Sequence, residues 1–287
     1  MDFIRYLRPA ALVAMLLSLA PLTGYAAPLN DAKAVPHLDS TGQTAYRDFL
    51  AADRHRAFAI APGGAWTWNA GGSNAKSIAD DTLQTCEFDN GQRCILYALD
   101  DKVVFDSKVW NGLWGPYLDR ATADRARIGL QRGERFHNLA FKSPAGKAMK
   151  LSDLRGKVIV LHFWGSWCPP CRREMPDMQQ LHRALGKSPG IEMVLLQVRE
   201  DIDTARKWAG QRRLQLPLYD SGANGKASEF LPLADGKSIH DRYIAEVFPT
   251  TYILDKHGII VFSHVGLISR WPEFLPLLRD VAARSGK

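Results

Sequence analysis

The feature that most constrains this 287-residue chain is an apolar strand followed at once by a helix that begins with two closely spaced cysteines. Residues 157–163 (KVIVLHF) form a nearly continuous apolar run, which is typical of a strand covered on both faces of a sheet. Residues 164–167 are a tight loop, and a helix is predicted from Cys168 to about Leu185. A buried strand that leads into a helix in this way predicts an α/β fold.

The elements that follow extend the same pattern. Apolar runs alternate with helical periodicity, and the chain ends in a β-hairpin and a helix. This order predicts a three-layer α/β/α sandwich around a mixed sheet, in a domain that covers residues 133–287. The expected strands are 191–198, 216–219, 251–254 and 259–264, and the expected helices are 204–211 and 271–283.

The two cysteines have the spacing and position of a redox pair. In Cys168-Pro169-Pro170-Cys171 they lie one helical turn apart, so they can close a disulfide with little movement of the backbone. At a helix start, unpaired N–H groups and the positive end of the dipole favour the thiolate of Cys168. Pro169 and Pro170 suit the first turn, where N–H groups have no partner within the helix. We therefore expect Cys168 to attack a disulfide and Cys171 to resolve the mixed disulfide.

The N-terminus has the pattern of an export signal. Arg5 and Arg8 precede the apolar run 10–20, and small residues at Gly24 and Ala26 suit a cleavage site. The run is too short to span a bilayer comfortably, so residues 1–26 are predicted to be a cleaved signal peptide. The mature chain is then expected to be soluble and periplasmic or otherwise exported. A membrane anchor formed by an uncleaved N-terminus is the alternative.

Export places the other two cysteines in an oxidising compartment, where close pairs form disulfides by default. Residues 27–45 have few apolar anchors and are interpreted as a tether. Residues 46–110 are predicted to be a small α+β domain of unknown function, with short strands, one helix and a hairpin. Cys86 ends this helix and Cys94 begins the next strand, so we favour a structural disulfide that stabilises a small core.

Residues 111–132 are predicted to be a linker with a polar, arginine-rich helix. The formal net charge is +7, but no compact Lys/Arg run is interleaved with aromatic residues, so nucleic acid is not an expected partner. We see no phosphate-binding glycine loop or nucleotide site and predict no small-molecule cofactor. The sequence also disfavours a peroxidase, because Gly165 stands where a threonine would precede the peroxidatic cysteine.

Three ordered blocks, residues 151–157 (LSDLRGK), 163–176 (FWGSWCPPCRREMP) and 247–255 (VFPTTYILD), resemble the thioredoxin superfamily. The closest resemblance is to its exported TlpA/ResA-like branch, which includes the cytochrome c maturation reductases. It covers roughly residue 133 to the C-terminus. It implies a thioredoxin-like protein-disulfide oxidoreductase that acts on exported proteins with disulfides or cysteines. It also implies a reductase rather than a general oxidant, with a membrane redox protein as electron donor.

The resemblance also assigns roles around the redox pair. Pro249 would be a cis-proline that faces the cysteines, and Phe248 would offer backbone groups that pair with a substrate strand. Glu174 would relay protons to the buried thiol, and a solvated helix glutamate is the alternative. Residues expected to contact substrate are Trp164, Trp167, Pro169, Pro170, Phe248 and Thr250.

The sequence departs from the family at two places. His162 stands where the superfamily usually has a buried Asp or Asn, so it is either a proton acceptor for the resolving thiol or a hydrogen-bonded core residue. Residues 220–247 form an insertion rich in Gly, Ser and Ala that leads to Pro249. A loop of this length is usually functional or disordered, and this one is a candidate for shaping the partner-docking face.

Two other classes of function stay open at this point. Cys168 and Cys171 with His162 or His182 are suitable copper or zinc ligands, but the sequence has no second ligand pair at a recognisable spacing. We therefore predict no metal site at this pair. In the other class, the N-terminal domain is a binding module and the thioredoxin-like domain is its redox partner.

Overall fold

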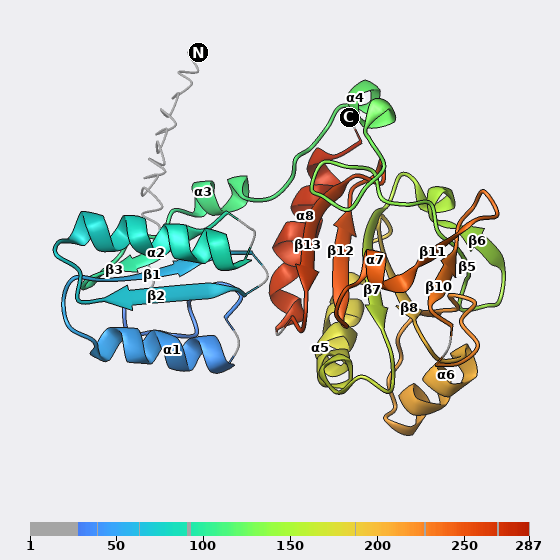
Figure 1. Ribbon diagram of the computed structural model, residues 1–287, viewed down its shortest axis with the longest axis horizontal. Coiled ribbons are helices and arrows are strands. Elements are labelled where there is room, and N and C mark those ends of the chain that lie inside the picture. The colour runs from blue at the N-terminus through green and yellow to red at the C-terminus, as the bar shows by residue number, and fades with distance from the viewer. Residues whose placement is uncertain are drawn as a thin grey trace, which may run out of the picture.

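The computed structural model describes residues 28–38, 40–62, 64–90, 93–186, 188–226, 228–268 and 270–286. The predicted signal peptide lies outside the described residues. Two units, each built on its own sheet, follow one another along the chain (Figure 1). No helix of the described part of the chain is long and apolar enough to cross a membrane.

The C-terminal unit contains a five-stranded sheet in the order β13-β12-β7-β8-β9. Strand β7 is central and buried along its whole length, as its apolar sequence predicts. It pairs in parallel with β8, and β8 pairs in parallel with β9, whereas β12 is antiparallel to both β7 and β13. The strands are β7 (Val158–Trp164), β8 (Ile191–Gln197), β9 (Leu218–Tyr219), β12 (Thr250–Leu254) and β13 (Ile260–Val265).

Side chains alternate along β7, so its two faces contact different layers. His162 contacts Trp271 at the start of the C-terminal helix, and Trp164 contacts Trp208 of α6. Phe163 faces the other way and contacts Phe136 and Tyr252. The sheet therefore lies between two layers, which confirms the predicted α/β sandwich. The first layer contains α5 (Pro169–Leu185), α6 (Ile202–Gln211), η2 (Trp271–Phe274) and α8 (Leu275–Arg284).

The second layer includes α7 and two small hairpins, and part of it comes from the insertion at residues 220–247. The hydroxyl of Tyr252 donates to the carbonyl of Ile244 in α7, which fixes this short helix to the sheet. Residues 230–244 of the insertion form β10, β11 and α7, so this part is structured. The elements of this layer are β5 (Ala140–Lys142), β6 (Ala148–Lys150), η1 (Leu151–Leu154), β10 (Phe230–Pro232), β11 (Ser238–His240) and α7 (Asp241–Ile244).

The N-terminal unit is a four-stranded antiparallel sheet in the order β2-β1-β3-β4, with α1 on one side and α2 on the other (Figure 1). Strand β1 is buried at all of its residues, as expected for a strand covered on both faces. A disulfide joins Cys86 near the end of α2 to Cys94 before β3. The elements are α1 (Ser40–Ala51), β1 (Arg56–Ile60), β2 (Trp66–Ala70), α2 (Ala75–Asn90), β3 (Ile95–Leu99) and β4 (Lys102–Val103).

The segment interpreted as a tether, residues 27–45, differs from that expectation. Helix α1 begins at Ser40, and Val35 and Leu38 are fully buried. The reason is long-range packing: residues 33–38 lie against the segment that joins β13 to α8. Burial of this kind leaves no periodic pattern in the local sequence.

The structure also differs from the predicted linker helix at residues 111–132. Two short helices, α3 (Ser107–Gly112) and α4 (Arg120–Arg125), occupy this region. Asp119 caps α4 through its side chain, and the helix ends at Arg125. Arg132 donates to the carbonyl oxygens of Leu113 and Gly115, which holds the remainder as an ordered loop.

We expect the Cys86–Cys94 disulfide to stabilise the N-terminal unit without serving the redox pair. Replacing both cysteines by serine (Cys86→Ser with Cys94→Ser) should lower the free energy of unfolding by about 2–3 kcal/mol, because it releases a short covalent loop. Urea denaturation followed by circular dichroism measures this loss. An unchanged denaturation midpoint would contradict the prediction, and disulfide exchange at Cys168 serves as the control for an intact C-terminal unit.

Candidate active site

The start of α5 builds the redox site. Strand β7 ends at Trp164, and Cys168 is the N-cap of α5 with an extended backbone. The backbone N–H of Cys171 donates to the sulfur of Cys168 over 3.3 Å. Pro169 and Pro170 occupy the first turn, where the missing N–H groups cost no helical hydrogen bond. The helix start thus holds positive charge density at the sulfur of Cys168.

Cys168 and Cys171 form a disulfide in this structure, and both are buried to different degrees. Cys168 is 3% exposed, whereas Cys171 is fully covered. Of the two cysteines, only Cys168 therefore keeps exposed surface that a protein thiol or disulfide can reach. This asymmetry fits an attacking cysteine followed by a resolving cysteine.

The loop before β12 forms the facing wall of the site. The Phe248–Pro249 peptide bond is cis. The carbonyl oxygen of Phe248 lies 3.4 Å from the sulfur of Cys168, so it can accept a hydrogen bond from the thiol in the reduced form. Pro249 carries no N–H group to compete for the same sulfur. The structure therefore brings together Cys168, Phe248 and Pro249, which are far apart in the sequence.

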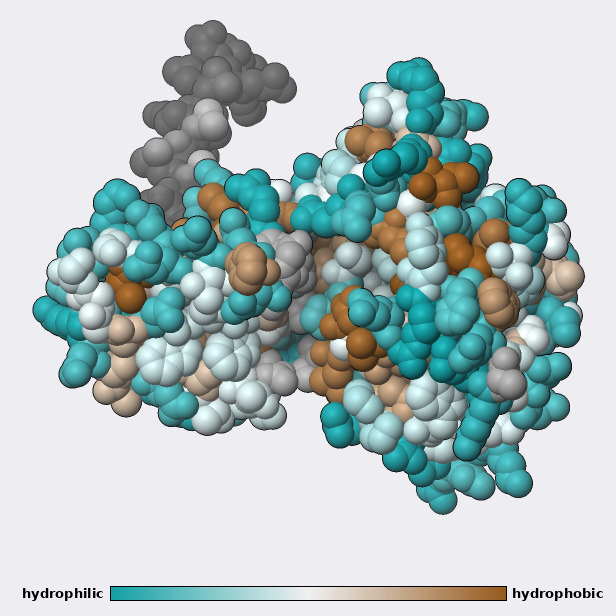
Figure 2. Space-filling view, in the orientation of Figure 1, coloured by the Kyte–Doolittle hydropathy of each residue, from teal (hydrophilic) through white to brown (hydrophobic). Residues whose placement is uncertain are grey.

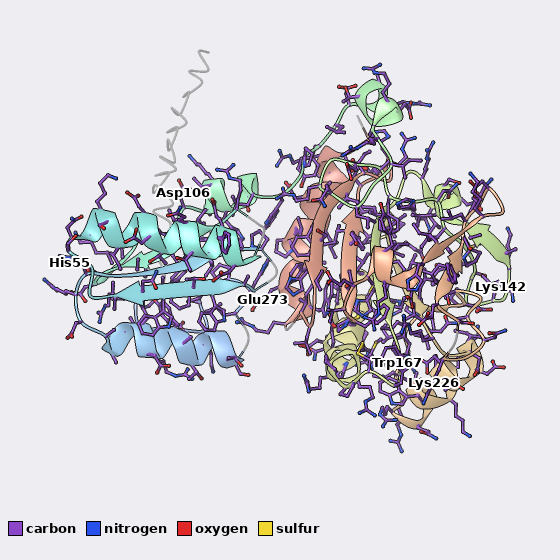
Figure 3. All side chains as sticks on the ribbon, viewed as in Figure 1. His55, Asp106, Lys142, Trp167, Lys226 and Glu273 are labelled. Carbon is purple, nitrogen blue, oxygen red and sulfur yellow. A yellow bond between two sulfur atoms is a disulfide. The ribbon has the colours of Figure 1, made fainter. Side chains whose placement is uncertain are left out.

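Trp167 lies on the rim of the site and is 39% exposed. Its indole N–H donates to the carbonyl of Val198 over 2.9 Å, and its ring meets the edge of Phe248 at 5.8 Å. Figure 3 shows Trp167 in the lower part of the C-terminal unit. Pro169 is exposed and Pro170 is partly exposed beside it. These residues form an apolar rim that a substrate can reach.

Two residues that were expected to contact substrate have side chains that are buried and do not reach the surface of the site. Trp164 is fully buried and packs against Trp208, 5.8 Å away between ring centroids. Thr250 is fully buried, and its hydroxyl donates to the carbonyl of Val247. Both residues support the loops from inside, because they are the end of β7 and the start of β12.

Glu174 is a buried carboxyl on α5, one turn beyond Cys171, so the two side chains share a helix face. Its Oε1 accepts hydrogen bonds from the indole N–H of Trp271 and from the backbone N–H of Ile268. Its Oε2 has no hydrogen-bond partner among the described residues. Burial raises the pKa of Glu174 to about 8, against the smaller opposite effect of these two donors. The structure therefore contradicts the alternative of a solvated helix glutamate.

His162 is fully buried in the middle of β7. Its Nδ1 lies 2.8 Å from the hydroxyl oxygen of Thr251, and its Nε2 has no partner among the described residues. Burial lowers the pKa of His162 to about 3, so the ring is neutral near neutral pH. Its ring also meets Trp271, which connects it to the same cluster as Glu174.

Two consecutive residues after β8 support both walls of the site, and sequence reasoning missed them. Glu200 accepts hydrogen bonds from the backbone N–H and the hydroxyl of Ser166, in the loop before Cys168. Arg199 forms a bidentate pair with the buried carboxylate of Asp241 in α7, at 2.7 and 2.9 Å. Their only sequence signal is a charged pair directly after an apolar strand. Among the described residues, no cluster of three His, Cys, Asp or Glu is arranged to hold a metal ion.

Comparisons with known proteins show which proteins the C-terminal unit resembles. The model of the AhpC/TSA family matches residues 133–263, which lie in the C-terminal unit. The thioredoxin-like protein YneN of Bacillus subtilis is 33% identical over 149 residues, 52% of this chain and 80% of that protein. The thiol-disulfide oxidoreductase ResA of Halalkalibacterium halodurans is 31% identical over 163 residues, 56% of this chain and 83% of that protein. A solved secreted thiol-disulfide isomerase from Corynebacterium glutamicum is 24% identical, with a TM-score of 0.40, over 57% of this chain and 91% of that chain.

The buried carboxyl of Glu174 predicts a pH-dependent difference in stability between wild type and Glu174→Gln. Because the folded-state pKa of about 8 lies above the unfolded value, the stability linked to the neutral carboxyl is present below the unfolded pKa and is lost as pH rises through about 8. We expect the wild type to lose free energy of unfolding relative to Glu174→Gln from about pH 5 to about pH 9. Urea denaturation of both proteins across this range measures the difference.

The buried histidines titrate in the opposite sense and are common to both proteins. Burial lowers the pKa of His37 and His162 to about 3, so their contribution to stability is lost as pH falls below the unfolded value. Subtracting one denaturation series from the other removes this contribution. A difference that stays constant with pH would show that Glu174 does not titrate in this range.

Proposed function

The chain belongs to the thioredoxin-like family of thiol–disulfide oxidoreductases, and on this premise we propose that it reduces disulfides of exported proteins through Cys168 and Cys171. The observation that carries the proposal is the geometry of Cys168. Its sulfur accepts the N–H of Cys171 at the helix start and faces the carbonyl of Phe248, and Cys168 is the more exposed of the two cysteines. A nucleophile needs this combination of stabilised thiolate and access.

The reaction begins with the reduced dithiol. The thiolate of Cys168 attacks one sulfur of the substrate disulfide, forms a mixed disulfide and releases the other substrate sulfur as a thiolate, which takes up a proton. Cys171 then loses its proton and attacks the sulfur of Cys168. This step breaks the mixed disulfide and releases the second substrate thiol. The substrate gains two electrons and two protons, and the enzyme is left with the Cys168–Cys171 disulfide seen in this structure.

Glu174 is the better-matched group for exchange of the Cys171 proton, and the ionised fraction of its carboxyl is the acceptor. The carboxyl lies one turn along the same helix face, and its pKa of about 8 is close to that of a thiol. The pKa of His162 is lowered to about 3, so its ring is a poor base at neutral pH. Of the two roles left open for His162, the core residue that hydrogen-bonds Thr251 is therefore favoured.

The rim around Cys168 fits an extended substrate segment. The cis-proline loop presents the backbone of Phe248 at the sulfur, and backbone groups in this position can pair with a short strand of the partner. Trp167 and Pro169 add apolar contact area on the other side. The substrate class is accordingly a protein cysteine or disulfide in an extended and accessible segment.

The proposed location of the protein is outside the cytoplasm, and the proposed direction of electron transfer is from the protein to its substrate. The N-terminal pattern of Arg5, Arg8 and the apolar run 10–20 supports export, where substrate disulfides form. A reductase in an oxidising compartment needs a continuous supply of electrons, so we propose a membrane redox protein as the donor that reduces the Cys168–Cys171 disulfide. The resemblance to cytochrome c maturation reductases supports the reducing direction.

Trapping of the mixed disulfide tests the order of attack. We expect Cys171→Ser to accumulate a covalent complex with a reducible protein such as insulin, because Cys168 attacks but nothing resolves the bond. Non-reducing electrophoresis detects the complex. Cys168→Ser is the matched control and should form none, because the remaining sulfur of Cys171 is fully covered. Equal trapping by both variants would refute the assigned roles.

The reduction potential of the Cys168–Cys171 couple tests the direction. A reductase is expected to lie near the potential of thioredoxin, about −270 mV, because its disulfide form must be the stable one. Equilibration of the full chain with glutathione buffers, followed by thiol trapping and mass spectrometry, measures it. A value near about −120 mV, the strongly oxidising end of the scale, would show an oxidase instead.

A further inference from the structure

Both hydrogen-bond donors to Glu174 come from one segment, which joins β13 to α8. Ile268 contributes its backbone N–H at 3.4 Å, and Trp271 contributes its indole N–H. The same segment is fixed to α5 at a second point, because the backbone N–H of Arg270 donates to the side chain of Asp177 over 2.9 Å. The position of this segment therefore determines how Glu174 is held and covered.

Arg270 connects this segment to the N-terminal part of the chain. Its backbone has a φ of 61°, in the left-handed region that a non-glycine residue rarely adopts. Its guanidinium donates to the carbonyl oxygens of Leu38 at 2.5 Å and Lys33 at 3.5 Å, and it forms an ion pair with Glu273. The contacts with Leu38 and Lys33, more than 200 positions away, hold Arg270 in this unfavourable local conformation.

Glu273 and His37 form the second half of the same contact. The carboxylate of Glu273 accepts the backbone N–H of His37 at 2.7 Å. The imidazole of His37 stacks on Phe274 at 4.4 Å and meets the edge of Trp110 at 5.2 Å. Figure 3 shows Glu273 at the boundary between the two units. The segment formed by residues 33–38 is therefore inserted between the N-terminal unit and the segment that holds Glu174.

We propose that Arg270 is a positioning residue for Glu174, through which residues 33–38 of the N-terminal part keep the proton-transfer carboxyl of the redox site covered. The proposal rests on the role of Glu174 in the proposed function, and it assigns a task to a part of the chain that the family match does not include. Arg270 itself does not touch the reacting sulfurs. It acts by fixing the segment that carries Ile268 and Trp271.

Loosening of the segment that joins β13 to α8 is expected to lower the pKa of Glu174. The charged group that acts on Glu174 is Asp177 on its own helix. Arg270 and Glu273 lie on the segment before α8, and His162 on β7 contacts Trp271, which donates to Glu174. Loosening the segment admits water and removes the two donors. Admitted water lowers the pKa of Glu174 and loss of the donors raises it, and burial is the larger cause. The pKa of Glu174 should therefore fall toward that of an ordinary carboxyl.

The experiment is a ¹³C NMR titration of the glutamate side-chain carboxyls in the oxidised full chain, with Glu174→Gln used to assign the signal. Arg270→Gln should lower the pKa of Glu174 by about one unit or more, since the guanidinium contacts are lost. Arg270→Lys keeps one positive donor and should give an intermediate value. Arg279→Gln, an exposed arginine on α8, is the matched control and should leave the pKa unchanged.

Thermal unfolding and circular dichroism verify that each variant is folded. A pKa of Glu174 in folded Arg270→Gln equal to that of the wild type would overturn the proposal. So would an equal shift in Arg279→Gln. If Arg270→Gln does not fold, the pKa of Glu174 is measured in Arg270→Lys instead. An unshifted pKa in that variant also overturns the proposal.

A separate measurement distinguishes a failure of the role proposed for Glu174 from a failure of the role proposed for Arg270. The rate of insulin reduction by Glu174→Gln, measured against pH, should lose the dependence that the carboxyl confers on the wild type. An unchanged profile would refute proton transfer by Glu174 while leaving the titration result for Arg270 valid. A changed profile together with an unshifted pKa in Arg270→Gln would refute only the positioning role.

Discussion

The hydrogen bond from the backbone N–H of Cys171 to the sulfur of Cys168 is the interaction on which the rest of the site depends. It exists because a fully buried strand, β7, delivers the chain to the first turn of α5 with its amide groups unpaired. The loop from β12 can then close over the same sulfur through Phe248. A chain that lost the burial of β7 would lose the direction of α5, and with it the geometry of the thiolate.

The same apolar layer that buries the redox pair sets the electrostatics beside it. Burial raises the pKa of Glu174 and lowers that of His162, so both groups are held in their neutral forms near neutral pH. They differ in consequence, because a carboxyl with a pKa of about 8 can exchange a proton with a thiol and a histidine with a pKa of about 3 cannot do so readily. Trp271 contacts both side chains and connects the two environments.

The central strand, the helix with its two cysteines and the mixed sheet could be predicted because each leaves a local pattern, as in residues 157–163 and Cys168-Pro-Pro-Cys171. The burial of Val35 and Leu38 could not, because it arises from contact with residues near the C-terminus. Glu200 was missed for a related reason: its partner Ser166 is 34 positions away. A charged residue has no periodicity that reveals whether its partner is solvent or a distant loop.

The sequence suggests two separate units, but in the structure their buried apolar residues pack into one core. The buried apolar residues form a cluster that runs from Val35 and Phe58 through Trp110 to Phe274 and β7. On the face shown in Figure 2, polar residues cover much of the exposed surface. A close-packed interior has few voids to absorb a displacement, so a shift of residues 33–38 is expected to reach the segment before α8. This shared core is what the proposed positioning of Glu174 through Arg270 and residues 33–38 requires.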